Sequence, residues 1–249
     1  MMSGKVFLVG AGPGDPGLIT VKGLACLKQA DVVIYDRLID ESILNEARPS
    51  AEKIYVGKAA NHHSLEQEMI TQLLIQNACE GKTVVRLKGG DPFVLGRGGE
   101  EAEALAQQSI PFEVVPGVSS AVAVPAYAGI PVTHRGVASS FTVITGHKAS
   151  GKEEPHIAWD KLSKGTDTLV ILMGIGNLEN LVEELIKNNK PRLTPVAVIT
   201  EGTTGRQRCV VGTLQNIAEK AKTENLRPPS VVVVGEVVKL RKCLRWFDK

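Results

Sequence analysis

The chain has 249 residues, of which 43% are hydrophobic, 22% charged and 4% aromatic, and its formal net charge is +2 at pH 7. This composition is typical of a globular protein, and the length suits one large domain or two small ones. The near-neutral charge gives no support for nucleic-acid binding, which usually needs a strong basic excess. The four cysteines are widely separated, and the sequence has no signal-peptide pattern and no apolar run of about 18 residues. We therefore expect a cytoplasmic protein without a membrane span.

In the first half, short apolar runs alternate with segments of helical periodicity. Strands are predicted at residues 5–9, 31–36, 53–56, 83–87 and 112–115, and helices at 19–29, 41–47, 64–79, 98–108 and 119–128. Ser64, with Gln67 three residues later, forms a capping-box pattern, and Gly81 follows the end of that helix. Strands that are apolar on both faces and separated by helices predict a parallel sheet covered on both sides.

From about residue 138 the pattern restarts. Strands are predicted at 140–145, 168–173, 196–200, 205–211 and 231–234, and helices at 178–188 and 213–223, with a polar loop at 148–155. Pro125 and Pro131 bracket a turn where the pattern changes. The predicted fold class is therefore α/β, with two α/β domains at residues 1–134 and 135–249.

Three glycine-rich segments, at residues 10–17, 86–93 and 116–120, follow predicted strands. In open parallel sheets ligands bind at the carboxyl ends of the strands, where glycines let the backbone approach closely. The first segment is similar to a dinucleotide fingerprint. However, Asp15 stands at its third glycine position, and Pro13 lacks the amide that a phosphate would bind. A tight turn explains each segment alone, but the three together predict one ligand crevice.

These segments, in this order, resemble the tetrapyrrole methyltransferase superfamily. The matching runs are residues 9–15, 32–38, 56–58, 86–93, 96–101, 114–117, 126–135, 145–147 and 173–174. The resemblance extends from about residue 5 to residue 247. The runs at 35–38, 96–100 and 129–135 are similar, more narrowly, to the members that methylate uroporphyrinogen III on carbon.

The resemblance implies a mainly parallel sheet in the N-terminal half, a mixed sheet in the C-terminal half and a cleft between the domains for S-adenosyl-L-methionine. It implies a homodimer that transfers two methyl groups to C2 and C7 of uroporphyrinogen III. The products would be S-adenosyl-L-homocysteine and, via precorrin-1, precorrin-2 for sirohaem and cobalamin synthesis. A separate precorrin-2 dehydrogenase or chelatase would act downstream.

The resemblance also implies a set of donor-binding positions: Pro13, Gly89, Gly90, Asp91, Val94, Ser119, Ser120, Met173 and Gly202. Ser119-Ser120 stands where many relatives have Thr-Ala, and the serine keeps a hydroxyl there. Val94 stands where Ile is common, so this chain loses a little apolar contact. We expect donor binding to survive both changes.

Methyl transfer from a sulfonium needs an in-line approach of the nucleophile, so positioning supplies most of the rate enhancement. Positive charge develops on the tetrapyrrole and a proton then leaves, so a carboxylate beside the ring can stabilise the charge or take the proton. By resemblance, Asp36 is the proton acceptor and Lys58 the proton donor. A capping role at a strand end is the alternative for Asp36.

The polycarboxylate substrate calls for several cations, above all Arg, which pairs bidentately with carboxylates. The predicted substrate-binding residues are Arg37, Arg97, Tyr127, His134 and Arg135, with Arg86 as a further candidate. The histidines, His134 included, show no metal-ligand spacing, so no metal site is predicted.

Four other functions stay open at this point. They are a later precorrin methyltransferase, a methyltransferase acting on diphthamide or ribosomal RNA, a donor-binding sensor without turnover, and a nicotinamide oxidoreductase. The run at 35–38 disfavours the first, and the weak net charge disfavours RNA as substrate. An NADH titration would test the last.

Overall fold

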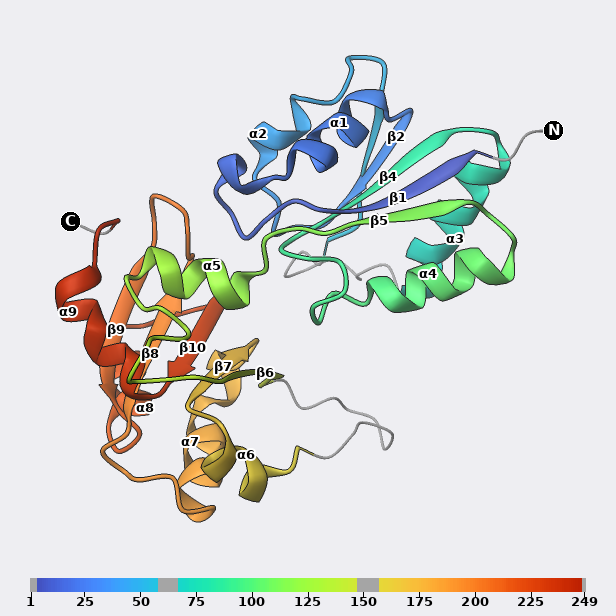
Figure 1. Cartoon of the computed structure of the whole chain (residues 1–249). Coiled ribbons are helices and arrows are strands. Elements are labelled where there is room, and N and C mark those ends of the chain that lie inside the picture. The colour runs from blue at the N-terminus through green and yellow to red at the C-terminus, as the bar shows by residue number, and fades with distance from the viewer. Residues whose placement is uncertain (1–3, 58–66, 147–156, 248–249) are drawn as a thin grey trace. The chain divides into compact units, whose positions relative to one another are not determined.

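The computed structural model describes residues 4–57, 67–146 and 157–247 (Figure 1). The chain divides into two compact units, Met1–Ser119 and Ser120–Lys249. This boundary lies earlier in the chain than the predicted one, which followed residue 134. The reason is that α5 (Ser120–Tyr127) packs Ala121 and Val124 into a core of the second unit. Within the described ranges, no helix is both long enough and apolar enough to cross a bilayer.

The first unit is built around a five-stranded sheet in the order β3-β2-β4-β1-β5. Every neighbouring pair is parallel, which confirms the predicted sheet type. The strands are β1 (Lys5–Gly10), β2 (Val32–Tyr35), β3 (Glu52–Tyr55), β4 (Thr83–Lys88) and β5 (Phe112–Val115). The helices are η1 (Pro16–Leu18), α1 (Val21–Gln29), α2 (Glu41–Leu44), α3 (Gln67–Cys79) and α4 (Gly98–Gln107). The predicted cap at Ser64 lies outside the described residues.

Both faces of this sheet are covered, as side chains that alternate along each strand require. On one face, Val85 and Leu87 of β4 belong to the core cluster that includes residues of α1 and α2. On the other, Val84 packs with the apolar residues of α3 and α4. Arg86 and Lys88 share the parity of Val84, so they point toward the α3 and α4 face.

The second unit holds a mixed sheet in the order β6-β7-β10-β8-β9. Its strands are β6 (Phe141–Thr145), β7 (Thr168–Leu172), β8 (Pro195–Thr200), β9 (Arg208–Thr213) and β10 (Ser230–Val234). β6 and β7 are parallel, whereas β10 is antiparallel to both β7 and β8. The helices after α5 are α6 (Trp159–Gly165), η2 (Ile175–Asn177), α7 (Leu178–Lys187), α8 (Ile217–Thr223), η3 (Glu236–Leu240) and α9 (Arg241–Leu244). The mixed sheet expected from the resemblance is confirmed.

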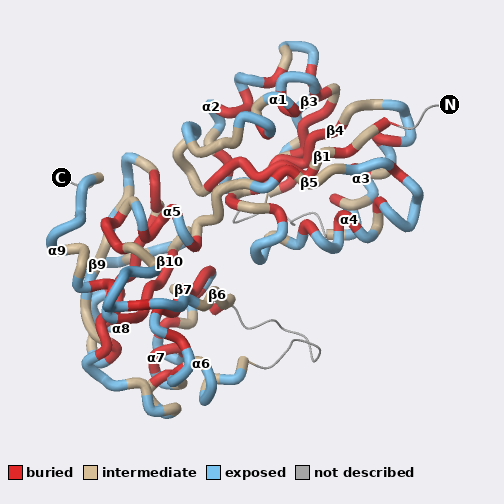
Figure 2. The backbone as a smooth tube through the Cα atoms, in the orientation of Figure 1, coloured by how far each residue is buried: buried red, intermediate tan, exposed pale blue. Residues whose placement is uncertain are grey.

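Two apolar layers enclose the second sheet as well. One face packs on α5 and η3, and the other on α7 and α8. Figure 2 shows that the buried backbone of both units follows the strands, while the outer turns of the helices are exposed.

β9 begins later than predicted because residues 201–207 form a turn, in which Gln207 Oε1 accepts from Thr203 N at 2.8 Å.

Candidate functional site

The three glycine-rich loops of the first unit meet at the carboxyl edge of its sheet. Gly12 and Gly90 exchange two backbone hydrogen bonds, of 3.2 and 2.7 Å, and the amide of Ala11 donates to Lys88 O at 2.8 Å. A Cβ on Gly10 would stand 2.5 Å from Gly117 Cα and 2.6 Å from Gly90 O. Backbone therefore packs directly on backbone where the first, second and third loops meet, which explains why side chains are missing there.

Asp91 holds the second and third loops together. Its Oδ1 accepts from the amides of Phe93 and Val94 at 2.8 and 3.2 Å, and its Oδ2 accepts from Gly117 N at 3.0 Å. A carboxylate can accept about four hydrogen bonds, so this residue holds the loops together and keeps about one acceptor position for a ligand. From the sequence, both a simple turn and a ligand-facing acid were open at this position.

The predicted catalytic residue Asp36 follows β2 and lies close to the second glycine loop. A Cβ on Gly89 would stand 3.1 Å from Leu38 Cβ, so the turn that carries Asp36 packs on that loop. Asp36 Oδ1 accepts from Arg86 Nη2 at 2.6 Å, and the Asp36 side chain is 30% exposed. It is therefore an ion-pair partner rather than a cap. Lys58, the other predicted catalytic residue, lies outside the described residues.

Arg86 is not a surface cation, which removes it as a substrate-binding candidate. Arg86 is only 2% exposed, and its Nε donates to Glu101 Oε1 at 3.1 Å. Lys88 is also buried and donates to the same oxygen at 3.0 Å. Burial, followed by the nearby Arg86 cation, lowers the pKa of Lys88. Sequence reasoning missed Glu101 and Lys88, although two cations spaced by two in an apolar strand were a usable signal.

Arg97 and Arg37, the predicted substrate cations of this unit, are both exposed. Arg97 forms a two-bond fork with Glu100, with Nε to Oε1 at 2.9 Å and Nη2 to Oε2 at 2.6 Å. The hydrogen bond from Arg97 lowers the pKa of Glu100. An incoming carboxylate would have to displace this internal partner, or share the guanidinium with it.

In the second unit, two predicted donor-binding residues follow strands at the same sheet edge. β7 and β8 both run antiparallel to β10, so their carboxyl ends lie on either side of its start. Met173 follows the first of these strands and Gly202 lies just beyond the second. A Cβ on Gly202 would stand 2.4 Å from Val124 Cγ1, so α5 packs tightly on that turn.

Unusual backbone conformations gather around the predicted positions of both units. Met173 has φ 56°, and Leu95 and Arg97 have φ 52° and 59° beside Val94. Glu201 and Thr203, on either side of Gly202, have φ 45° and 67°. The other described non-glycine residues with positive φ follow the ends of α4, α7 and α8, where a left-handed residue is ordinary: Ser109, Asn189 and Asn225. Strained backbone is enriched at functional sites, so these turns support the predicted set.

The remaining predicted residues are accessible. Pro13, Ser119, Ser120 and Tyr127 are partly buried, and Val94, His134 and Arg135 are exposed. The rings of Trp246 and Phe247 lie 5.0 and 4.8 Å from that of Tyr127, centroid to centroid. His134 Nδ1 lies 2.9 Å from Arg135 O. Within the described residues, His, Cys, Asp and Glu form no group of three or more placed for a metal ion.

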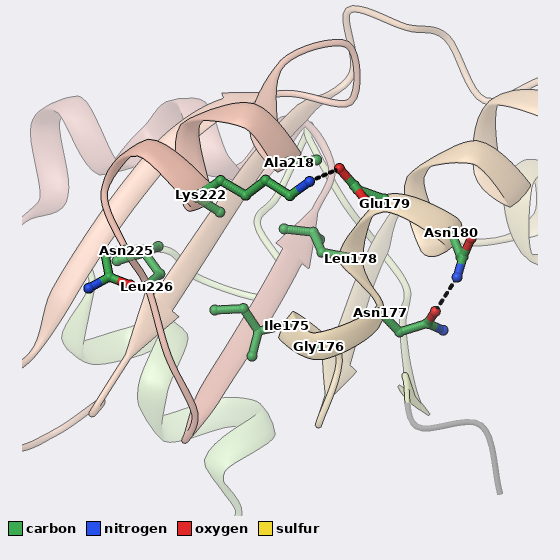
Figure 3. A pocket seen from close by; sticks show the side chains of 11 residues that line it. Ile175, Gly176, Asn177, Leu178, Glu179, Asn180, Ala218, Lys222, Asn225 and Leu226 are labelled. Carbon is green, nitrogen blue, oxygen red and sulfur yellow. Dashed lines mark hydrogen bonds and ion pairs between the residues drawn. The ribbon is translucent and has the colours of Figure 1, made fainter. Parts of the chain in front are cut away.

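A separate hollow of about 310 Å³ lies in the second unit, between α7 and α8 (Figure 3). Two pairs of its polar side chains contact each other. Lys222 pairs with Glu179, and Asn180 donates to Asn177 at 2.6 Å. None of its lining residues is a predicted site residue, so the hollow is not the candidate site.

Comparison with known proteins fits this arrangement. Residues 5–218 match the family model of tetrapyrrole (corrin/porphyrin) methylases. The chain is 62% identical over 238 residues to a uroporphyrinogen-III C-methyltransferase of Methanocaldococcus jannaschii, covering 95% of this chain and 98% of that one. It is 54% identical over 235 residues to a uroporphyrinogen-III C-methyltransferase of Priestia megaterium, covering 94% and 98%.

A solved structure gives the same result for the fold. The uroporphyrin-III C-methyl transferase of Thermus thermophilus, complexed with S-adenosyl homocysteine, superposes with a TM-score of 0.81 at 40% identity. The match covers 95% of this chain and 94% of that one. The glycine loops, the two sheets and these matches lead to one conclusion: the chain belongs to the tetrapyrrole methylase family.

Proposed function

We propose that the chain transfers two methyl groups from S-adenosyl-L-methionine to C2 and C7 of uroporphyrinogen III, giving precorrin-2 through precorrin-1. The observation that carries this proposal is near full-length identity of 62% to a relative named for that reaction. The glycine loops and the acid beside them are what such a reaction needs. A nicotinamide oxidoreductase and a non-catalytic sensor lack comparable support.

The donor fits the glycine loops because its approach needs bare backbone. Gly10 and Gly117 leave no space for a Cβ between the loops, and Gly89 lies against the turn that carries the proposed catalytic acid. The proposed donor-binding residues are Pro13, Gly89, Gly90, Asp91, Val94, Ser119, Ser120, Met173 and Gly202. When bound, the donor supplies a methyl group on a positively charged sulfur that leaves as a neutral thioether.

The chain's own residues position the substrate and handle its charge. Arg37, Arg97, Tyr127, His134 and Arg135 are proposed to bind the polycarboxylate, with Arg97 exchanging its internal partner for a substrate carboxylate. Asp36 is proposed to face the pyrrole ring that gains positive charge on methylation. There it stabilises that charge or takes the departing proton, and Lys58 donates a proton.

We further propose that the protein works as a cytoplasmic homodimer and that a separate dehydrogenase or chelatase consumes its product in sirohaem or cobalamin synthesis. The support for both parts is the family resemblance. Sedimentation equilibrium measures the assembly state, and a monomer at micromolar concentration would contradict the first part.

The decisive experiment is anaerobic incubation of the purified protein with uroporphyrinogen III and S-adenosyl-L-methionine, followed by mass spectrometry. We expect a product that carries two added methyl groups. A single addition, no addition, or a preference for a later precorrin would refute the proposal. Substituting S-adenosyl-L-homocysteine for the donor is the negative control.

A further inference from the structure

Three buried charged side chains lie behind the partly exposed acid of the proposed site and form a cluster with it. Arg86 and Lys88 come from β4 and Glu101 from α4, and each of these residues is at most 3% exposed. Asp36, at the end of β2, is the fourth member and the one that reaches solvent. Two cations and two anions balance, which is the condition for burying charge in a protein core.

Arg86 joins the two carboxylates and is itself fixed in place. Nη2 donates to Asp36 Oδ1 at 2.6 Å and Nε donates to Glu101 Oε1 at 3.1 Å. Nη1 donates to the carbonyl oxygens of Ile34 and Leu87, both at 3.3 Å. With all three nitrogens engaged, the planar guanidinium has one orientation, and the position of Asp36 Oδ1 follows from it.

Glu101 anchors the inner end of the cluster through a single oxygen. Oε1 accepts from Arg86, from Lys88 Nζ at 3.0 Å and from Gln67 Nε2 at 3.0 Å. Oε2 is buried and has no hydrogen-bond partner among the described residues. A buried ion pair selected for stability alone would satisfy both oxygens, and an apolar replacement is often more stable still. The arrangement therefore points to a role other than holding α4 on the sheet.

The outer end of the cluster is left available for chemistry. Within the described part of the chain, Asp36 Oδ2 accepts no hydrogen bond, whereas Oδ1 is held by Arg86. β4, which carries Arg86, also supports the first glycine loop, because Lys88 O accepts from Ala11 N at 2.8 Å. The end of β4 thus holds both this loop and the Asp36 carboxylate.

We propose that Arg86, locked by Glu101, is a positioning residue that fixes the Asp36 carboxylate toward the tetrapyrrole during methyl transfer. This inference rests on the proposed function, because it assigns a task to Asp36 in that reaction. Neither Arg86 nor Glu101 contacts the substrate: Arg86 acts through Asp36, and Glu101 acts through Arg86. Their loss should lower kcat while leaving donor affinity and KM for the tetrapyrrole nearly unchanged.

The test is a double-mutant cycle on kcat with uroporphyrinogen III, using Arg86→Lys, Asp36→Asn and the double variant. Lys keeps the charge but cannot hold two carboxylates in one plane, so we expect roughly a tenfold or greater loss of kcat from Arg86→Lys. If Arg86 works through Asp36, the double variant is no slower than Asp36→Asn alone. Multiplicative losses would overturn the inference.

A second variant and a matched control distinguish the positioning role from a purely structural one. Glu101→Gln keeps the shape of Glu101 but removes its charge, and should show the same drop in kcat and the same non-additivity with Asp36→Asn. Leu105→Ala, on the same helix and 0% exposed, destabilises the same core without touching the cluster. It should lower the unfolding midpoint but leave kcat unchanged at temperatures where the protein is folded.

The outcomes distinguish the two levels of the proposal. If the wild type adds no methyl group to uroporphyrinogen III, the proposed function fails, and the positioning role fails with it. If the wild type is active but Asp36→Asn has full kcat, the function stands and the positioning role is wrong. If Asp36→Asn is slow while Arg86→Lys and Glu101→Gln change only the unfolding midpoint, the cluster is structural and the inference is again overturned.

Discussion

Adding one methyl group at Gly10 tests whether the three glycine loops depend on direct backbone contact. In Gly10→Ala the new Cβ would stand 2.5 Å from Gly117 Cα and 2.6 Å from Gly90 O, about 1 Å inside ordinary van der Waals contact. Backbone atoms cannot rotate away, so the loops must separate. Overpacking costs about 1–3 kcal/mol, and one weakened loop hydrogen bond adds about 0.5–1.5 kcal/mol. We therefore expect a loss of about 2–4 kcal/mol in unfolding free energy.

Two measurements check this expectation. Urea unfolding gives the stability loss, and hydrogen exchange should show faster exchange of the Gly12, Gly90 and Gly117 amides. Calorimetry should show donor affinity reduced at least about tenfold, which corresponds to 1.4 kcal/mol. Gly99→Ala is the matched control, since its Cβ would meet nothing within 4 Å and it lies in a helix, where Ala is favoured. If Gly10→Ala unfolds and binds the donor like the wild type, neither the stability nor donor binding depends on direct backbone contact between the loops.

Two further predictions concern charged side chains of the first unit. Hydrogen bonds from Lys22, then from Lys5, lower the pKa of Glu113 from 4.5 to about 2. Its stabilisation is therefore present above about pH 4.5 and is lost as the pH falls toward 2, so the urea midpoints of wild type and Glu113→Gln should converge in that window. A difference that stays constant down to pH 2 would contradict this. Arg97→Ala, which also removes the fork to Glu100, should weaken tetrapyrrole binding at least about tenfold with donor affinity intact, as measured by calorimetry. Equal loss of both ligands would refute it.

The elements of the fold were largely predictable because their signals are local. β5 has the predicted bounds, and α4 ends one residue before the predicted limit. Apolar runs bounded by glycine and proline carry this information in the chain itself. The start of β9 was misplaced because side-chain bonds of residues 201–207 replace strand pairing there. α6 has only seven residues, too few for a clear apolar period, and was not predicted.

The glycine loops of the site were predictable for a different reason. Carboxyl ends of parallel strands share one edge, so glycines after β1, β4 and β5 had to meet. The pairing of Arg86 with Glu101 was not predictable, because it depends on how α4 packs on the sheet rather than on any local pattern. The same holds for Asp91, whose backbone partner Gly117 belongs to another loop.

The alternation of charge and apolar side chains along β4 bears on how the sheet assembles. A slip of one residue in the pairing of β4 would turn Arg86 and Lys88 into the apolar layer beneath α1 and α2, and would bring Leu87 against Glu101. Two cations in that layer would lose the carboxylates that neutralise them, at a cost of several kcal/mol. The three buried side chains behind the proposed acid thus discriminate against misregistered intermediates. A variant that loses them is expected to populate misfolded species as well as to turn over more slowly.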